Sequence, residues 1–271
     1  MSLETVDDAR RIRGLSRAEY DRLLAYLEQL PPGGLAEQSA CSDWQVYQVV
    51  SHLGSGPEIN AARLESALRG APPQTDEQRK AIWDRWDSRK PDEMLPPFRQ
   101  ANDGYFELLD SLGDDELGRV IPWFVGPVPV ATALAFRLNE QALHAWDIRW
   151  ARDRQARLTP EALPDLLQLN LEPARVGNLA KLERAGQLAG KTIQFVYSHP
   201  EGALNLRLEG DGVKVSPDLA AASDLSVELP AEALVRLIWG RYDVPAGLSS
   251  GELELSRPEL AESLQALFPG R

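Results

Sequence analysis

Residues 137–147 read RLNEQALHAWD and lie in the middle of a long, largely apolar segment. Glu140 and His144 are four residues apart, so a helix places them one above the other on the same face. Most other positions between 131 and 152 are apolar, which is typical of a buried central helix. The polar stripe of this helix therefore faces the interior of a helical unit, where ionisable groups need partners.

An E-x-x-x-H pair offers a carboxylate oxygen and an imidazole nitrogen within one helical turn. Metal sites in helix bundles take further ligands from the facing helices. His52, on a second apolar helix, is the candidate third ligand, and two histidines with one glutamate match the pattern of catalytic zinc. Asp147, one turn beyond His144, is a candidate to orient that imidazole. The same residues also have plainer interpretations: Glu140 and His144 as a polar pair, His52 as a core histidine, and Asp147 as the partner of a nearby arginine. The residues alone leave both interpretations open.

The composition excludes several classes of protein. Shares of 43% hydrophobic and 26% charged residues over 271 positions predict a globular chain. A net charge of −12 argues against nucleic acid and anionic membranes as partners, since both require a basic surface. The single cysteine, Cys41, excludes an internal disulfide and favours a reducing compartment. No signal peptide and no long apolar run are apparent, so we expect a cytoplasmic location.

Hydrophobic periodicity divides the chain into two predicted domains. A helical domain, residues 1–188, has candidate helices at 4–30, about 42–68, 75–90, 91–112, 131–152 and 160–186. We expect the second helix to begin with a capping box at Ser42, Gly54 to Pro57 to interrupt it, and 118–130 to be a loop. A small α+β domain, residues 189–271, has candidate strands at 191–197, 203–209, 213–216, 224–229 and 251–256, and helices at 230–239 and 258–268. Gly-Asp-Gly at 210–212 predicts a hairpin turn.

Two motifs resemble a known family. The segment CSDWQVYQVVSHL, residues 41–53, resembles a C-x-x-W…V-x-H-L element. Residues 137–147, preceded by Gly126-Pro127, resemble an R-x-x-E-x-x-x-H-x-W-D element. Both are similar to elements of the mycothiol-dependent maleylpyruvate isomerase family, within the DinB-like superfamily. The second domain is more weakly similar to sterol carrier protein type 2.

This resemblance implies a fold and an activity. The fold would be a DinB-like four-helix bundle followed by a small α+β domain similar to sterol carrier protein type 2. His52, Glu140 and His144 would bind a divalent metal, zinc first, and would carry catalysis together with Asp147. The implied cosubstrate is mycothiol, whose thiol a metal holds as the nucleophilic thiolate.

The expected function is therefore that of a metal-dependent transferase or isomerase that uses a small-molecule thiol on a small electrophilic substrate. We take Arg137, and Trp123 in the segment 118–130, as candidate contacts of the cosubstrate. A homodimer is expected by analogy with DinB-like bundles. Two other functions stay open: a non-catalytic small-molecule or lipid-binding protein with a structural metal, and a metal-dependent hydrolase with Asp147 as base.

Overall fold

The chain folds into two compact units, Met1–Ala162 and Leu163–Arg271. The computed structural model describes residues 3–210, 212–216 and 222–270. The boundary predicted at residue 188 lies inside the second unit. Helices α7 (Leu163–Asn170) and α8 (Pro173–Leu179) join that unit because they pack on its helix α9 and its strand β5. Helical periodicity shows that a segment buries one face, but it does not show which core receives that face.

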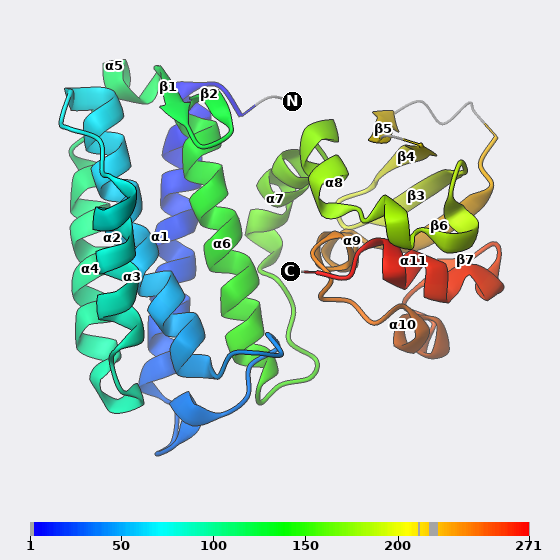
Figure 1. Ribbon diagram of the computed structural model, residues 1–271, viewed down its shortest axis with the longest axis horizontal. Helices are drawn as coiled ribbons and strands as arrows, with labels where there is room; N and C mark the ends of the chain where they lie inside the picture. Colours follow the sequence, from blue (N-terminus) through cyan, green and yellow to red (C-terminus); the bar gives the residue numbers. More distant parts are fainter. Residues whose placement is uncertain (1–2, 211, 217–221, 271) are drawn as a thin grey trace. The chain divides into compact units, whose positions relative to one another are not determined.

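Four long helices run side by side in the first unit (Figure 1). They are α1 (Val6–Glu28), α2 (Val46–Arg69), α4 (Leu95–Asp110) and α6 (Val130–Trp150), and the shorter helices are α3 (Asp76–Asp87) and α5 (Asp114–Leu117). Helix α1 packs against α6, and α2 packs against α4. Apolar side chains from all four helices fill the core, among them Ile12, Leu23, Leu27, Val49, Leu53, Leu64, Phe98, Phe106, Leu138 and Ile148. This is the predicted four-helix bundle, and α6 is buried along most of its length as expected.

Helix α2 continues through the glycines and the proline that were expected to interrupt it. Pro57 has no N–H, so the carbonyl of Leu53, four residues earlier, lacks its helical donor. Arg137 on α6 replaces that donor, with Nη2 2.8 Å from the Leu53 oxygen. Gly56 leaves room for the guanidinium, since a Cβ there would lie 2.6 Å from Arg137 Nη1. A buried arginine therefore completes the helix and ties α6 to α2.

The start of α2 was predicted wrongly. The helix begins at Val46, and its N-cap is Gln45 rather than Ser42. The N–H of Gln45 donates to Gln48 Oε1 at 2.8 Å, which satisfies a backbone group that the helix leaves unpaired. Serine is a favoured N-cap residue and glutamine is not, and Gln45 makes no side-chain cap bond, so the local pattern favoured the wrong position.

The segment predicted as a loop at 118–130 is a β-hairpin. Strands β1 (Val120–Trp123) and β2 (Gly126–Pro129) pair antiparallel. Ile121 and Trp123 point inward in alternation with exposed neighbours, and Gly126 takes a φ of 106° at the turn. The alternation of buried and exposed residues is not evident in the sequence, because the two strands contain three prolines and a glycine. Such residues usually indicate irregular backbone.

The second unit contains a five-stranded sheet with the order β5-β4-β3-β6-β7. The strands are β3 (Thr192–Ser198), β4 (Gly202–Glu209), β5 (Gly212–Ser216), β6 (Leu225–Pro230) and β7 (Glu254–Leu255). All neighbours are antiparallel except β3 and β6. One buried row crosses four strands at Leu204, Phe195, Val227 and Leu255. Asp211 of the predicted Gly-Asp-Gly turn lies outside the described residues.

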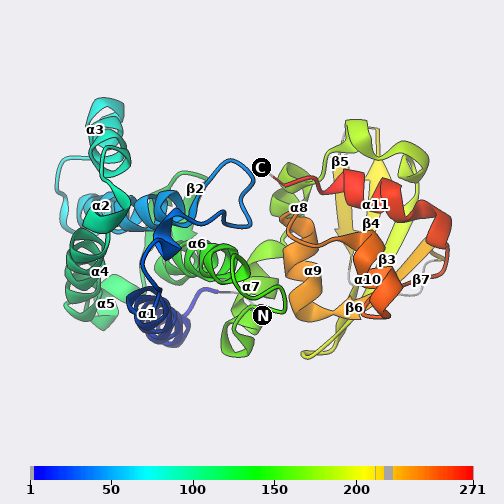
Figure 2. The same cartoon turned by 90° about the horizontal axis from the view of Figure 1, so that it is seen from below.

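Three helices gather on one side of this sheet, namely α9 (Ala231–Ile238), α10 (Val244–Ser250) and α11 (Ala261–Leu267) (Figures 1 and 2). Short 3-10 turns lie at Gly34–Ala36, Pro91–Glu93, Pro160–Ala162, Leu182–Arg184, Gly186–Leu188 and Pro258–Leu260. Among the described residues, no helix combines the length and the apolar character needed to cross a membrane. The chain is thus an all-helical unit followed by a small α+β unit.

Candidate metal centre

Helices α2 and α6 bring the three predicted ligands together. His52 Nε2 lies 3.2 Å from Glu140 Oε2, and His144 Nε2 lies 3.7 Å from the same oxygen. The ligand atoms of all three residues lie within 4.8 Å of one another. A tetrahedral zinc with bonds of about 2.0–2.1 Å separates its ligand atoms by roughly 3.3 Å. The spacing and the donor set of two imidazoles and one carboxylate therefore fit such an ion.

Asp147 orients one of these imidazoles. Its carboxylate is fully buried, and Oδ2 lies 2.8 Å from His144 Nδ1. An ionised carboxylate only accepts hydrogen bonds, so Nδ1 carries the proton and Nε2 keeps its lone pair on the side of Glu140. Cys41 Sγ donates to the same carboxylate at 3.2 Å, and the Ala40 N–H donates to the Asp147 carbonyl at 3.0 Å. The half-buried Cys41 thus supports the site from behind.

Glu140 and His144 are held in the protonation states that a metal requires. Burial raises the pKa of Glu140, but the His52 hydrogen bond and the charges of His144, His52 and Arg137 outweigh it and lower the pKa to about 2. Burial also lowers the pKa of His144, against the opposing effect of Asp147. A carboxylate and a neutral imidazole are both competent ligands near neutral pH.

The other two candidate residues lie outside this cluster. Arg137 is 3% exposed and donates to the backbone of Leu53, so it is part of the bundle's internal structure. Trp123 belongs to the hairpin and lines a different cavity, with Arg63 of α2. Arg63 follows His52 by eleven residues, which corresponds to about 16 Å along a helix. The structure therefore separates Trp123 from the histidines and Glu140, whereas Arg137 lies one turn from Glu140 but is engaged with the backbone of α2.

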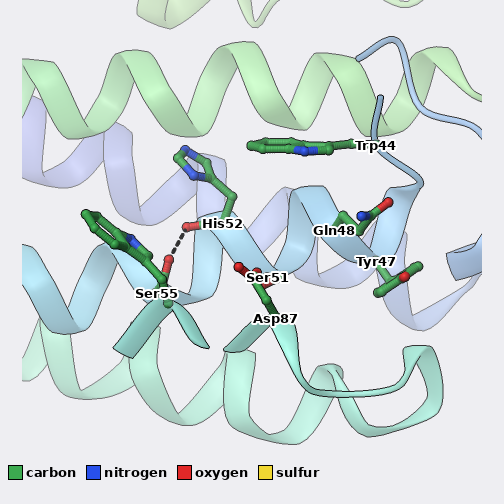
Figure 3. Close-up of a pocket in the computed structure, with 8 residues that line it drawn as sticks. Trp44, Tyr47, Gln48, Ser51, His52, Ser55 and Asp87 are labelled. Atoms are coloured by element: carbon green, nitrogen blue, oxygen red, sulfur yellow. Dashed lines mark hydrogen bonds between the residues drawn. The ribbon is translucent and has the colours of Figure 1, made fainter. Parts of the chain in front are cut away.

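A cavity of about 440 Å³ lies beside His52 (Figure 3). It is lined by Trp44, Tyr47, Gln48, Ser51, His52, Ser55, Trp83 and Asp87. The Trp44 ring centroid lies 5.5 Å from that of His52 and 6.2 Å from that of His144, so the indole flanks both imidazoles. Ser51 Oγ donates to Asp87 Oδ1 at 2.6 Å, and Ser55 Oγ donates to the His52 carbonyl at 3.0 Å.

Sequence reasoning missed most of this lining. Gln48, Ser51 and Ser55 share the stripe of α2 that carries His52, so helical spacing in the sequence was a usable signal for them. Trp83 and Asp87 come from α3, and no local pattern places that helix. Its position follows from Trp86, whose buried ring packs directly on Gly54 of α2.

Comparisons with known proteins agree with this arrangement of a helical bundle followed by an α+β unit. Residues 16–149 match the family model of the mycothiol maleylpyruvate isomerase N-terminal domain, and residues 169–269 match that of the SCP-2 sterol transfer family. The chain therefore belongs to the mycothiol maleylpyruvate isomerase family and carries an SCP-2 domain as its second unit.

Solved structures show the same fold. A crystal structure of the mycothiol-dependent maleylpyruvate isomerase matches with a TM-score of 0.64 and 15% identity, over 94% of this chain and 96% of that one. A variant of that isomerase with one histidine replaced by alanine matches with the same values. A comparison with curated protein sequences found no significant match. The family and the order of its two domains, as inferred from the two motifs, are confirmed.

Proposed function

We propose that the chain is a metal-dependent enzyme that uses a low-molecular-weight thiol of the mycothiol type on small electrophiles, as a transferase or an isomerase. The observation that carries this proposal is the convergence of His52, Glu140 and His144 beside a cavity of about 440 Å³. Membership of the family supports the choice of thiol. A cytoplasmic location, where such thiols stay reduced, suits this chemistry.

The residues of the site have different proposed roles. His52, Glu140 and His144 would hold the ion, and Asp147 fixes the ring of His144 so that Nε2 faces the site. A divalent ion, zinc by its donor set, would lower the pKa of a bound thiol and keep it as the thiolate. The thiolate sulfur adds to an electron-poor carbon of the substrate. In an isomerase the sulfur would leave after rotation about the former double bond, which re-forms. In a transferase the sulfur would stay bonded: after addition to a double bond the neighbouring carbon takes up a proton, and on an aryl halide the halide ion leaves as the carbon–sulfur bond forms.

The lining of the cavity favours an uncharged electrophile. Its walls are two indole rings, a tyrosine, and small polar groups, and its one carboxylate is Asp87. No lysine or arginine is among the lining residues, all of which the structure describes. A dicarboxylate would meet Asp87 without a compensating cation, whereas a planar neutral substrate stacks on Trp44 and Trp83.

Metal content and thiol-dependent turnover, measured on the same preparations, test the proposal. The full chain is purified without chelator alongside Glu140→Ala, His144→Ala and the exposed control Glu161→Ala. We expect near one zinc per chain in the wild type and the control, together with mycothiol-dependent consumption of an aryl halide. Both should be lost in the two ligand variants.

Three results would point elsewhere. A metal-free variant that keeps full turnover refutes the mechanism. Turnover that needs metal but no thiol supports the hydrolase. Absence of zinc from every form, with none taken up on titration, leaves a non-catalytic binding protein.

A further inference from the structure

A second cavity, of about 330 Å³, lies where the hairpin β1–β2 meets α2 and the start of α3. Its lining residues are Arg63, Ser66, Ala67, Pro73, Gln74, Arg79, Pro122, Trp123 and Phe124. The volume is in the range of small-molecule sites, which begin at about 300 Å³. The lining mixes aromatic rings with two guanidinium groups and contains no acidic residue.

This gathering of positive charge is unusual for so acidic a chain, which has 41 acidic residues against 29 basic ones. The half-buried Arg63 makes no ion pair with any described residue. Its guanidinium carbon lies 5.0 Å from the ring centroid of Trp123 and 5.6 Å from that of Phe124. Burial and the nearby charge of Arg79 lower the pKa of Arg63. The cation therefore bears a desolvation cost that a bound anion would offset.

Arg79 is a second cation with a fixed orientation. It donates to the Gln74 carbonyl at 2.7 Å and pairs with the exposed Asp76. The guanidinium groups of Arg63 and Arg79 thus line one cavity, where their like charges repel each other and an anion between them would be favourable. Phe124, 62% exposed, adds an apolar face that the described residues leave open to solvent.

We propose that this cavity binds a small aryl carboxylate. Guanidinium groups match a carboxylate in charge and in fork geometry, and Arg63 is the group available to form that pair. The exposed ring of Phe124 offers a face on which a planar aromatic body stacks, and the buried ring of Trp123 contributes an apolar wall. The site is separate from the metal centre, because Arg63 lies about 16 Å from His52 along α2. The proposal therefore does not depend on the thiol chemistry.

Isothermal titration calorimetry of the full chain with 2-naphthoate tests this site. The matched neutral probe is 2-naphthamide, and the variants are Arg63→Gln, Phe124→Ala, His144→Ala and the control Arg99→Gln. Arg99 is an exposed arginine paired with Glu28, so its loss makes the same charge change elsewhere on the unit. The His144 variant is included because a carboxylate also coordinates an ion at the metal centre.

We expect one naphthoate per chain and no comparable binding of the amide. Arg63→Gln should weaken the affinity by about tenfold or more, the loss of one charge-assisted pair. Phe124→Ala removes an exposed ring and should weaken the affinity by about threefold to tenfold without disturbing the fold. The control and His144→Ala should stay within about twofold of the wild type.

Several results would overturn the proposal. Equal binding of the amide shows that the anionic group plays no part. Wild-type affinity in both Arg63→Gln and Phe124→Ala places the ligand elsewhere. A loss confined to His144→Ala assigns binding to the metal centre, and full competition by inorganic phosphate at the same concentration removes the role of the aromatic walls.

Discussion

Replacement of Asp147 by asparagine tests how far the support of His144 controls metal binding. In the wild type, Oδ2 accepts from His144 Nδ1 at 2.8 Å and from Cys41 Sγ at 3.2 Å, within a fully buried environment. A hydrogen bond to a charged group contributes about 1.5–3 kcal/mol, and a neutral one about half of that. Asparagine keeps a carbonyl acceptor of the same size, so Asp147→Asn should lose about 1–2 kcal/mol.

That loss converts to a zinc dissociation constant raised about fivefold to thirtyfold. It agrees with the roughly tenfold to hundredfold effect typical of groups that support a metal ligand from outside. The assay is a competition titration against a chromophoric chelator near neutral pH. Asp115→Asn, which makes the same charge change at an exposed position, is the matched control.

The reasoning depends on contact rather than on net charge. Asp147→Asn with a zinc affinity within twofold of the wild type, at unchanged thermal stability, would refute it. So would an Asp115→Asn variant that loses as much affinity. Cys41→Ala removes one donor to the Asp147 carboxylate and should have a smaller effect than Asp147→Asn.

Two further predictions concern stability and are measured by urea unfolding. Gly54→Ala in α2 should destabilise by about 1–3 kcal/mol, because its Cβ would lie 2.3 Å from the ring of Trp86. Gly104→Ala in α4, where an added Cβ would meet no atom within 4 Å beyond its own helix backbone and chain neighbours, should instead stabilise by about 0.5–1 kcal/mol. Equal effects of the two substitutions would contradict the packing argument. Glu232→Gln in the second unit should destabilise by about 3 kcal/mol, since it breaks a buried two-bond pair with Arg236 (2.7 and 2.9 Å). A change below about 1 kcal/mol would show that other contacts of Arg236 suffice.

The sequence alone was enough for the bundle and for the ligand cluster, because both depend on helical periodicity. Glu140 and His144 share a stripe at a spacing of four, and a helix leaves little freedom in how they lie. His52 was harder, since nothing local determines which face of α2 meets α6. It was the candidate third ligand because it lies on a second apolar helix, and the resemblance of its motif to the family supported that choice. The packing of α2 against α6 agrees with it.

The remaining features depend on contacts between distant residues. The continuity of α2 through Pro57 requires Arg137, which is eighty residues away in the chain. Trp83 lines the same cavity as His52, in a helix whose neighbouring Trp86 packs its ring on Gly54, where no side chain intervenes. Local sequence patterns predict that α2 breaks near Pro57, and they give no packing partner for α3. The contacts between distant residues in the structure show that α2 continues and that α3 packs on it.

The bond from Arg137 to Leu53 has a consequence for how the centre would be loaded. Leu53 neighbours His52 in α2, and Arg137 precedes Glu140 by one turn in α6. One guanidinium therefore fixes the sliding register of the two helices at the level of the ligands. The packing of the protein itself sets the spacing of the donor atoms. Binding of an ion would therefore cost little free energy for ordering the ligand side chains and their helices. A metal bound there would be selected by its size and coordination geometry, since a frame held in this way does not readily adapt to the ion.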